Sequence, residues 1–138
     1  YLYHMQTDCF EIVITVAPYD LDEMQHVNNV VYLQWVQDAA LAHWNAKAGA
    51  AIREKFKWVV LRHEIDYKSP GFLGDELILK TWVYDYNGVR STRLVQIIRK
   101  KDNKLLAQAS TTWCLIQATT GKPVRIGEEI MNLFKPQV

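Results

Sequence analysis

The stretch DLDEMQHVNNVVYLQWVQDAALAHWNAKA, residues 20–48, joins a polar loop to a long apolar segment that contains no Gly or Pro. The segment from Val30 to about Ala48 is rich in Ala, Leu, Gln and Trp, and Gly49 after it is a stop signal, so the segment predicts a helix. Its apolar positions occupy most of the helix circumference, which is typical of a buried helix. We therefore expect one long central helix that other elements must enclose.

Five segments of alternating apolar residues predict the strands that enclose this helix. One segment precedes the helix and four follow it: 11–17, then 58–67, 77–86, 90–99 and 105–117. Asn87-Gly88 is a strong hairpin signal, and we expect the last four strands to follow one another as hairpins. A short tail around 128–134 is expected to be helical. This order favours an α+β fold in which one antiparallel five-stranded sheet wraps around the helix.

The length and composition limit the kind of protein. A chain of 138 residues, 49% of them hydrophobic, suits one ordered domain over residues 1–138. A formal net charge of +1 lacks the basic excess of a nucleic-acid binder, and no apolar run approaches the ~20 residues of a membrane span. The first residue is not Met and no signal-like apolar core follows it, so we expect a trimmed or mature chain.

The two cysteines, Cys9 and Cys114, are isolated in the sequence and have no metal-ligand spacing. Together with the four His residues they form no metal constellation, and we predict neither a metal nor another cofactor. A reduced, cytoplasmic compartment fits these cysteines best, although the sequence leaves a disulfide open.

The predicted sheet leaves strands open at its edges, and open edges are surfaces that proteins normally protect. Pairing two such sheets edge to edge would remove them. We therefore expect a homodimer, or a dimer of dimers, and the mass of the protein in solution tests this expectation.

The polar loop before the helix carries groups that suit acyl-transfer chemistry. Within ten residues it holds carboxylates at Asp20 and Asp22, the imidazole of His26, and the carboxamides of Asn28 and Asn29. A helix start has unpaired N–H groups and a partial positive charge, which stabilise a developing oxyanion. A carboxylate and a histidine beside such a helix start therefore predict a site for attack on a carbonyl carbon.

The order of these elements and motifs resembles that of hot-dog fold acyl-CoA thioesterases of the 4-hydroxybenzoyl-CoA thioesterase-like family. The resemblance covers essentially the whole chain. It rests on Asp22 with His26-Val27-Asn28-Asn29, on Tyr67-x-x-Pro70 with Gly74-Asp75-Glu76-Leu77, and on Gly121-Lys122-Pro123-Val124-Arg125-Ile126. The loop motif, with Tyr32 after it, is also similar to that of plant acyl-ACP thioesterases, although Met24 stands where those enzymes have an Asn.

The resemblance implies hydrolysis of an acyl-CoA, or an acyl-ACP, to the free acid and the thiol without a cofactor. It assigns Asp22 as the catalytic carboxylate, either the nucleophile or the base for water. It assigns a backbone N–H near Asn29 or Val30 as the donor to the thioester carbonyl, with His26 as an orienting or proton-handling partner. By the same analogy, three residues are expected to bind substrate, the last two at the coenzyme A phosphates: Tyr32, Arg90 and Ser91.

Each of these residues also has a structural interpretation. Asp22 could be a loop acid, His26 could hold the loop through its ring nitrogens, and Asn28 is a good helix cap. His43 and His63 occupy core-like positions, so we interpret them as packed, hydrogen-bonded histidines. Four tryptophans are interpreted as core or interface residues, of which one or two could line an acyl pocket: Trp35, Trp58, Trp82 and Trp113.

Two other functions stay open on the sequence. A hot-dog hydratase or dehydratase also uses Asp and His in a loop, but its loop usually has Asn-Pro before the His, where this chain has Met24-Gln25. A non-catalytic acyl-CoA binding module would bind the thioester without turnover. Free thiol supports hydrolysis, loss of enoyl absorbance supports the hydratase, and binding without either supports the module.

Overall fold

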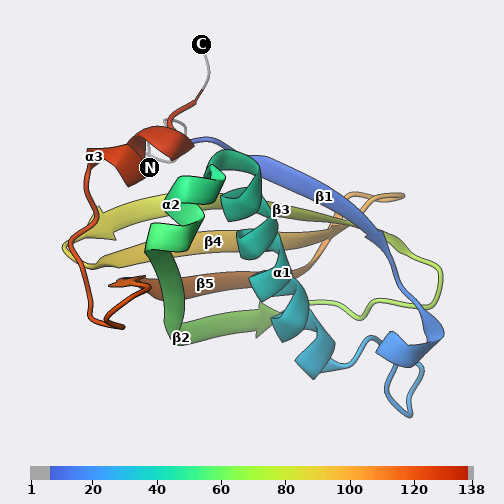
Figure 1. The fold of residues 1–138 in the computed structure, drawn as a ribbon. Helices are drawn as coiled ribbons and strands as arrows, with labels where there is room; N and C mark the ends of the chain where they lie inside the picture. Colours follow the sequence, from blue (N-terminus) through green and yellow to red (C-terminus); the bar gives the residue numbers. More distant parts are fainter. Residues whose placement is uncertain (1–6, 137–138) are drawn as a thin grey trace.

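The computed structural model describes residues 7–136. Figure 1 shows its five strands as one sheet with the long helix across it, so the predicted α+β fold is confirmed. Within residues 7–136, no helix is long and apolar enough to span a membrane. The elements in chain order, with η for a 3-10 turn, are β1 (Phe10–Thr15), η2 (Pro18–Asp20), α1 (Asn29–Lys47), α2 (Ala50–Lys55), β2 (Phe56–Tyr67), β3 (Glu76–Asn87), β4 (Arg90–Arg99), β5 (Lys104–Gln117), α3 (Glu128–Met131) and η3 (Asn132–Phe134).

The strand order in the sheet is β1-β3-β4-β5-β2, and every neighbouring pair is antiparallel. The hairpins β3–β4 and β4–β5 follow the prediction. The expected hairpin between β2 and β3 is wrong, because β2 lies at the far border beside β5 and β1 takes the place beside β3. The connection 68–75 permits this crossing: its residues can extend roughly 26 Å, whereas three strand spacings amount to roughly 14 Å.

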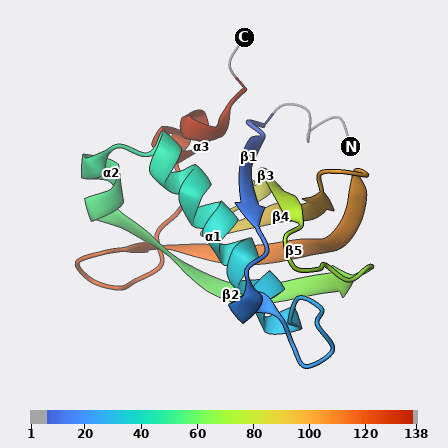
Figure 2. The ribbon, with the colours of Figure 1, turned by 90° about the vertical axis from the view of Figure 1, so that its right-hand side faces the viewer.

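Helix α1 lies against one face of the sheet in both views (Figure 1 and Figure 2). Its buried residues recur every three or four positions, as on one face of a helix: Tyr32, Trp35, Val36, Ala39, Ala40, His43 and Trp44. The prediction of a helix enclosed all round is wrong for a single chain, because one sheet covers only one face. Val30 and Leu41 on the uncovered side are 69% and 56% exposed.

The apolar interior forms two clusters along α1. One packs the first half of α1, with Tyr32 and Val36, against strand residues such as Val95. The other surrounds Trp44 near the end of α1 and includes Phe134. The tail that was expected to be helical is confirmed as α3 and η3, and it closes the second cluster.

The short helix α2 was not predicted. Gly49 ends α1, as expected, but it is also the N-cap of α2. The two helices are joined by Arg53, whose Nη1 donates to the Asn45 carbonyl at 3.1 Å. Ile52 of α2 packs partly buried against the second cluster, but six residues are too few for a helical period to be recognised in the sequence.

Strand β2 has a neighbour on one side only, and its other edge is open along twelve residues. Leu61 on this strand is an exposed apolar side chain. Val30, Gln37 and Leu41 lie on one face of α1, and this face adjoins β2, since Gln37 Nε2 lies 3.2 Å from His63 Nε2. A long open edge beside exposed apolar side chains is typical of a surface that a second sheet covers.

Candidate functional site

The motif loop between η2 and α1 is held by the carboxylate of Asp22. The N–H groups of Met24 and His26 donate to Asp22 Oδ1 at 2.9 and 3.1 Å, and the Asp22 N–H donates to the His26 carbonyl at 2.7 Å. These bonds close a tight turn in which Gln25 has a left-handed φ of 65°. Within the described part of the chain, Asp22 Oδ2 accepts no hydrogen bond. One oxygen therefore orders the loop, and the other is available for chemistry.

The start of α1 is capped by Asn28. Its Oδ1 accepts the Val30 N–H at 3.0 Å, and its own N–H donates to the Asp20 carbonyl at 2.9 Å. The Val30 N–H is thus used by the cap, whereas the Asn29 N–H has no acceptor within residues 7–136. Of these two N–H groups at the start of α1, that of Asn29 is the one left without an acceptor in the described part of the chain.

Removal of this cap should weaken the start of α1. We expect Asn28→Ala to lower the free energy of unfolding by about 1 kcal/mol, because the Val30 N–H loses its acceptor. For a domain of this size, the melting temperature should fall by about 2–6 °C. Urea unfolding measures the change, and Asn28→Asp, which keeps the acceptor oxygen, is the matched control. Equal stability of Asn28→Ala and the wild type would contradict the capping role.

The connection from β2 to β3 supports the motif loop from the other side. The Val27 N–H donates to the Gly71 carbonyl at 2.9 Å, and a Cβ on residue 71 would stand only 3.0 Å from the Val27 side chain. Phe72 packs edge-on against His26, with ring centroids 5.3 Å apart. Asp75 holds this segment, since its Oδ2 accepts the Phe72 N–H at 3.0 Å. The imidazole of His26 is therefore positioned beside the Asp22 turn by packing.

The other predicted site residues occupy different places. Tyr32 is only 2% exposed and packs in the core against Trp35, and burial raises the pKa of its hydroxyl. Ser91 is buried on β4, where its hydroxyl donates to the Asp85 carbonyl, and Arg90 before it is exposed. Arg90 and Ser91 lie at the end of the sheet that is remote from the motif loop. A single chain therefore does not bring them to Asp22.

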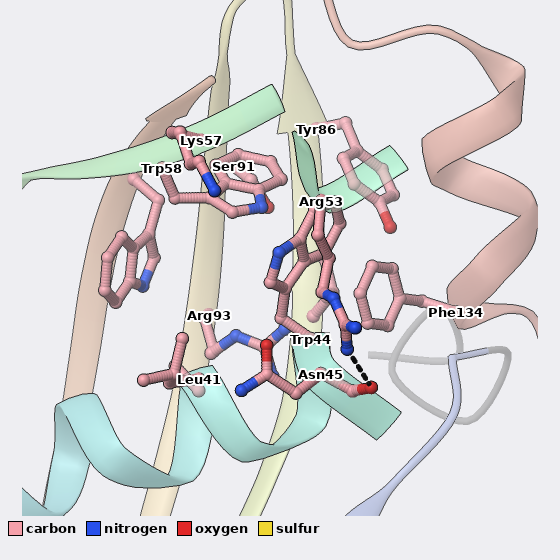
Figure 3. A pocket seen from close by; sticks show the side chains of 13 residues that line it. Leu41, Trp44, Asn45, Arg53, Lys57, Trp58, Tyr86, Ser91, Arg93 and Phe134 are labelled. Carbon is pink, nitrogen blue, oxygen red and sulfur yellow. Dashed lines mark hydrogen bonds between the residues drawn. The ribbon is translucent and has the colours of Figure 1, made fainter. Parts of the chain in front are cut away.

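A cavity of about 330 Å³ opens at this remote end of the sheet, beside the second half of α1. Figure 3 shows Leu41 and Asn45 of α1 on one side of it and Lys57, Trp58 and Ser91 on the opposite side. At 1.5 Å per residue, the cavity-lining residues of α1 lie about 17–24 Å along the helix from its start at Asn29. The cavity is lined by Ala40, Leu41, Trp44, Asn45, Arg53, Lys57, Trp58, Val83, Tyr86, Ser91, Arg93, Trp113 and Phe134.

A buried arginine, Arg93, lines this cavity and is only 7% exposed. Its Nη1 donates to His43 Nδ1 at 2.8 Å and to Thr81 Oγ1 at 3.1 Å. Because an arginine only donates, His43 Nδ1 must accept, and its ring proton is on Nε2, which donates to Asp8 Oδ2 at 2.7 Å. Burial lowers the pKa of Arg93 to about 10 and the pKa of His43 to about 4. Near pH 7, Arg93 is therefore charged and His43 neutral.

The position of Arg93 could have been found from the sequence. On β4, every second residue from Ser91 is buried, so Arg93 shares a face with Val95 and Ile97. The sequence analysis assigned substrate binding to Arg90 and Ser91 and gave no role to Arg93. Arg93 can be recognised as a charged residue at a position of β4 where the alternating pattern predicts a buried apolar side chain.

Acidification should destabilise the protein through His43. Its pKa is lowered to about 4, mainly by burial and then by Arg93, from an ordinary value of 6.5. Between these values the unfolded chain binds more protons than the folded one. The free energy of unfolding should therefore be highest above pH 6.5 and fall by up to about 3 kcal/mol as the pH drops to 4. Urea unfolding from pH 4 to 8 measures this slope, and an equal slope in His43→Gln would contradict the assignment.

The remaining His and Cys residues are not gathered into a metal site in the described part of the chain. His63 Nδ1 lies 2.8 Å from Thr111 Oγ1, so His43 and His63 are both confirmed as hydrogen-bonded histidines. Cys9 is exposed and Cys114 is buried, and both are free thiols. Among residues 7–136, no group of three or more His, Cys, Asp or Glu side chains is placed to hold a metal ion.

Comparisons with known proteins identify the family. Residues 16–134 match the family model of the thioesterase-like superfamily. The long-chain acyl-CoA thioesterase FadM of Escherichia coli (strain K12) is 29% identical over 134 residues, which cover 91% of this chain and 96% of that protein.

Two solved structures share the fold over nearly the same length. The YbaW probable thioesterase from Escherichia coli has a TM-score of 0.77 at 25% identity, covering 89% of this chain and 94% of that one. Slr0204, a 1,4-dihydroxy-2-naphthoyl-CoA thioesterase from Synechocystis, has a TM-score of 0.79 at 19% identity, covering 91% and 94%. The chain therefore belongs to the thioesterase-like superfamily: it has the hot-dog fold that its sequence predicted, and it is a thioester hydrolase.

Proposed function

We propose that the protein hydrolyses an acyl-CoA to the free acid and CoA, with Asp22 as the catalytic carboxylate. The observation that carries this proposal is the unequal use of its two oxygens. Oδ1 is held by the N–H groups of Met24 and His26, and within residues 7–136 Oδ2 has no partner. A carboxylate fixed through one oxygen needs little reorganisation to present the other. Similarity to FadM, a long-chain acyl-CoA thioesterase, supports acyl-CoA as the substrate.

Two routes are chemically open to Asp22. As nucleophile, its Oδ2 attacks the thioester carbonyl carbon, the C–S bond breaks, and the CoA thiolate takes up a proton; water then hydrolyses the acyl-aspartate anhydride. As base, it accepts a proton from the water that attacks the same carbon. In both routes the carbonyl oxygen becomes negative, and the Asn29 N–H and the positive end of α1 would stabilise it. His26 would orient the water or supply the proton to the thiolate.

We further propose that each catalytic site is shared between two copies of the chain. The Tyr67 hydroxyl, at the end of β2, donates to the Asn29 carbonyl at 3.3 Å, whereas Lys57 and Trp58, at the start of β2, line the cavity. Antiparallel pairing of two open β2 edges sets the end of one strand beside the start of the other. The motif loop of one copy would then reach the cavity of the other, and the cavity would receive the acyl group.

Exposed apolar side chains support this pairing. Leu61 on β2 and Val30 and Leu41 on the adjoining face of α1 would be covered by the second copy. Ser91 lines the cavity that would receive the acyl group, whereas Arg90 beside it is exposed, so only Arg90 keeps its proposed role at the coenzyme A phosphates. The expected homodimer is in this proposal the unit that completes the site.

The free thiols of Cys9 and Cys114 fit a reducing compartment, and we propose that the reaction takes place in the cytoplasm. Cell fractionation followed by detection of the chain tests this proposal.

Thiol release from a panel of acyl-CoAs, aliphatic and aromatic, tests the proposed reaction. We expect at least one acyl-CoA of the panel to release free thiol, at a rate proportional to the enzyme concentration. The same panel should include an enoyl-CoA. Loss of enoyl absorbance without thiol would favour the hydratase, and binding with neither signal would favour a non-catalytic module.

A further inference from the structure

The cavity beside α1 has a charge pattern that a purely apolar acyl chain does not need. Three of its lining residues are cations, Arg53, Lys57 and Arg93, and none is acidic. Arg93 is buried, Arg53 is half-buried and Lys57 is exposed, so the positive charge extends from the interior to the surface. A cation enclosed by apolar walls attracts an anion strongly.

Arg93 is a buried cation without a carboxylate partner. Among residues 7–136, no carboxylate oxygen lies within 4.0 Å of its guanidinium. Its hydrogen bonds in this part of the chain all come from Nη1, and the Phe134 ring lies 5.6 Å from the guanidinium carbon. These contacts fix the group but leave the Nε and Nη2 hydrogens for another acceptor. Buried charges are normally paired, so a ligand is the expected partner.

Two further polar atoms, on residues that line the cavity, also lack partners. The Tyr86 hydroxyl and Trp113 Nε1 are buried, and neither has a hydrogen-bond partner within the described chain. Burial raises the pKa of Tyr86 to about 12, so its hydroxyl keeps its proton and can donate. The indole N–H of Trp113 can only donate. Buried donors destabilise the ligand-free protein unless a ligand accepts their hydrogen bonds.

We propose that this cavity binds a carboxylate carried on an apolar or aromatic body. The planar guanidinium of Arg93 matches the geometry of a carboxylate, and Tyr86 and Trp113 offer further donors. The indoles of Trp44 and Trp58 provide apolar walls for the body of the ligand. A single buried cation suits a monoanion better than a more highly charged phosphate.

The carboxylate can come from two sources. One is an acyl group with a distal carboxylate, and for this source the inference rests on the proposed function. The other is a free carboxylic acid, which needs no thioester chemistry. The experiments below separate the binding of a carboxylate from the reaction of a thioester.

Calorimetric titration with octanoate and with 1-octanol tests the carboxylate without any thioester. We expect octanoate to bind at least about tenfold more tightly than the alcohol, and this preference to disappear in Arg93→Met. Lys100→Gln removes an exposed cation just after β4 and is the matched control, which should keep the preference. Equal affinity for the acid and the alcohol in the wild type, or an undiminished preference in Arg93→Met, overturns the inference.

Tyr86→Phe tests the inference even if Arg93→Met does not fold. Deletion of an unpartnered buried hydroxyl should leave the melting temperature of the ligand-free protein unchanged or higher. The same change should weaken octanoate binding by about tenfold. A lower melting temperature with unchanged octanoate affinity would show a structural hydroxyl that no ligand uses, and would overturn the inference.

Hydrolysis of octanoyl-CoA and of the monothioester octanedioyl-CoA distinguishes the two sources. An acyl group with a distal carboxylate predicts a kcat/KM about tenfold higher for octanedioyl-CoA, and loss of this preference in Arg93→Met. Inhibition by octanoate that is lost in Arg93→Met, without such a preference, identifies a free acid as the ligand. If no acyl-CoA releases thiol but octanoate still binds through Arg93, the proposed function fails and this inference stands.

Discussion

Asp22→Asn should remove thiol release and leave the fold intact, with kcat lower by about 10³-fold or more. The amide oxygen of Asn can replace Oδ1, so the N–H groups of Met24 and His26 keep an acceptor and the turn survives. The change removes only the charge and the nucleophilicity of the second oxygen. The acyl-CoA panel measures the loss, and an unchanged melting temperature confirms that the loop is still folded.

Asp20→Asn is the matched control for this change. Asp20 Oδ2 accepts the Ala17 N–H at 2.9 Å, a bond that an amide oxygen can also accept, and this carboxylate lies before the turn at Asp22. We expect its activity to stay within about twofold of the wild type. An Asp22→Asn enzyme that keeps more than about a tenth of the wild-type rate would refute the catalytic role. Asp22→Ala alone would not distinguish a catalytic role from a structural one, because it also removes the acceptor that orders the loop.

The elements with their own periodicity were predictable from the sequence. Helix α1 begins at Asn29, one residue before its predicted start at Val30, and β4 spans Arg90–Arg99 as predicted. Helical and strand periodicities are local properties of the chain, which is why they can be read without a structure. The place of β2 beside β5 is a non-local property, since it depends on the path of the connection after Tyr67. A succession of strands therefore predicted a hairpin that does not exist.

The same distinction holds for the candidate site. The motif loop was predictable because its polar residues are contiguous and its bonds join residues two and four positions apart, as from Met24 and His26 to Asp22. The cavity was not predictable, because Trp44, Tyr86 and Arg93 come from three elements that only the folded sheet brings together. Sequence patterns therefore indicated the carboxylate that we propose as catalytic, but not the cavity that we propose for the acyl group.

Mixing two inactive variants should restore activity, because the proposed site takes its loop from one copy and its cavity from the other. The first variant is Asp22→Asn. The second is Ala40→Phe, which fills the cavity from a buried position on α1. In a mixed dimer, the intact loop of the second copy meets the intact cavity of the first. With equal amounts and free exchange, half of the dimers are mixed and each has one good site, so about one quarter of the wild-type activity should return.

A second mixture, of wild-type chains with doubly substituted chains, makes this test decisive. A chain that carries both Asp22→Asn and Ala40→Phe inactivates both sites of any dimer that it forms with a wild-type chain. One site has the altered loop and the other has the filled cavity. Equal mixing should then halve the activity of the wild-type chains, since only half of them remain paired with each other. If loop and cavity act within one chain, the first mixture stays inactive and the second keeps its full activity. The two mixtures thus change in opposite directions, so neither impaired folding nor slow exchange of subunits can produce the expected pair of results.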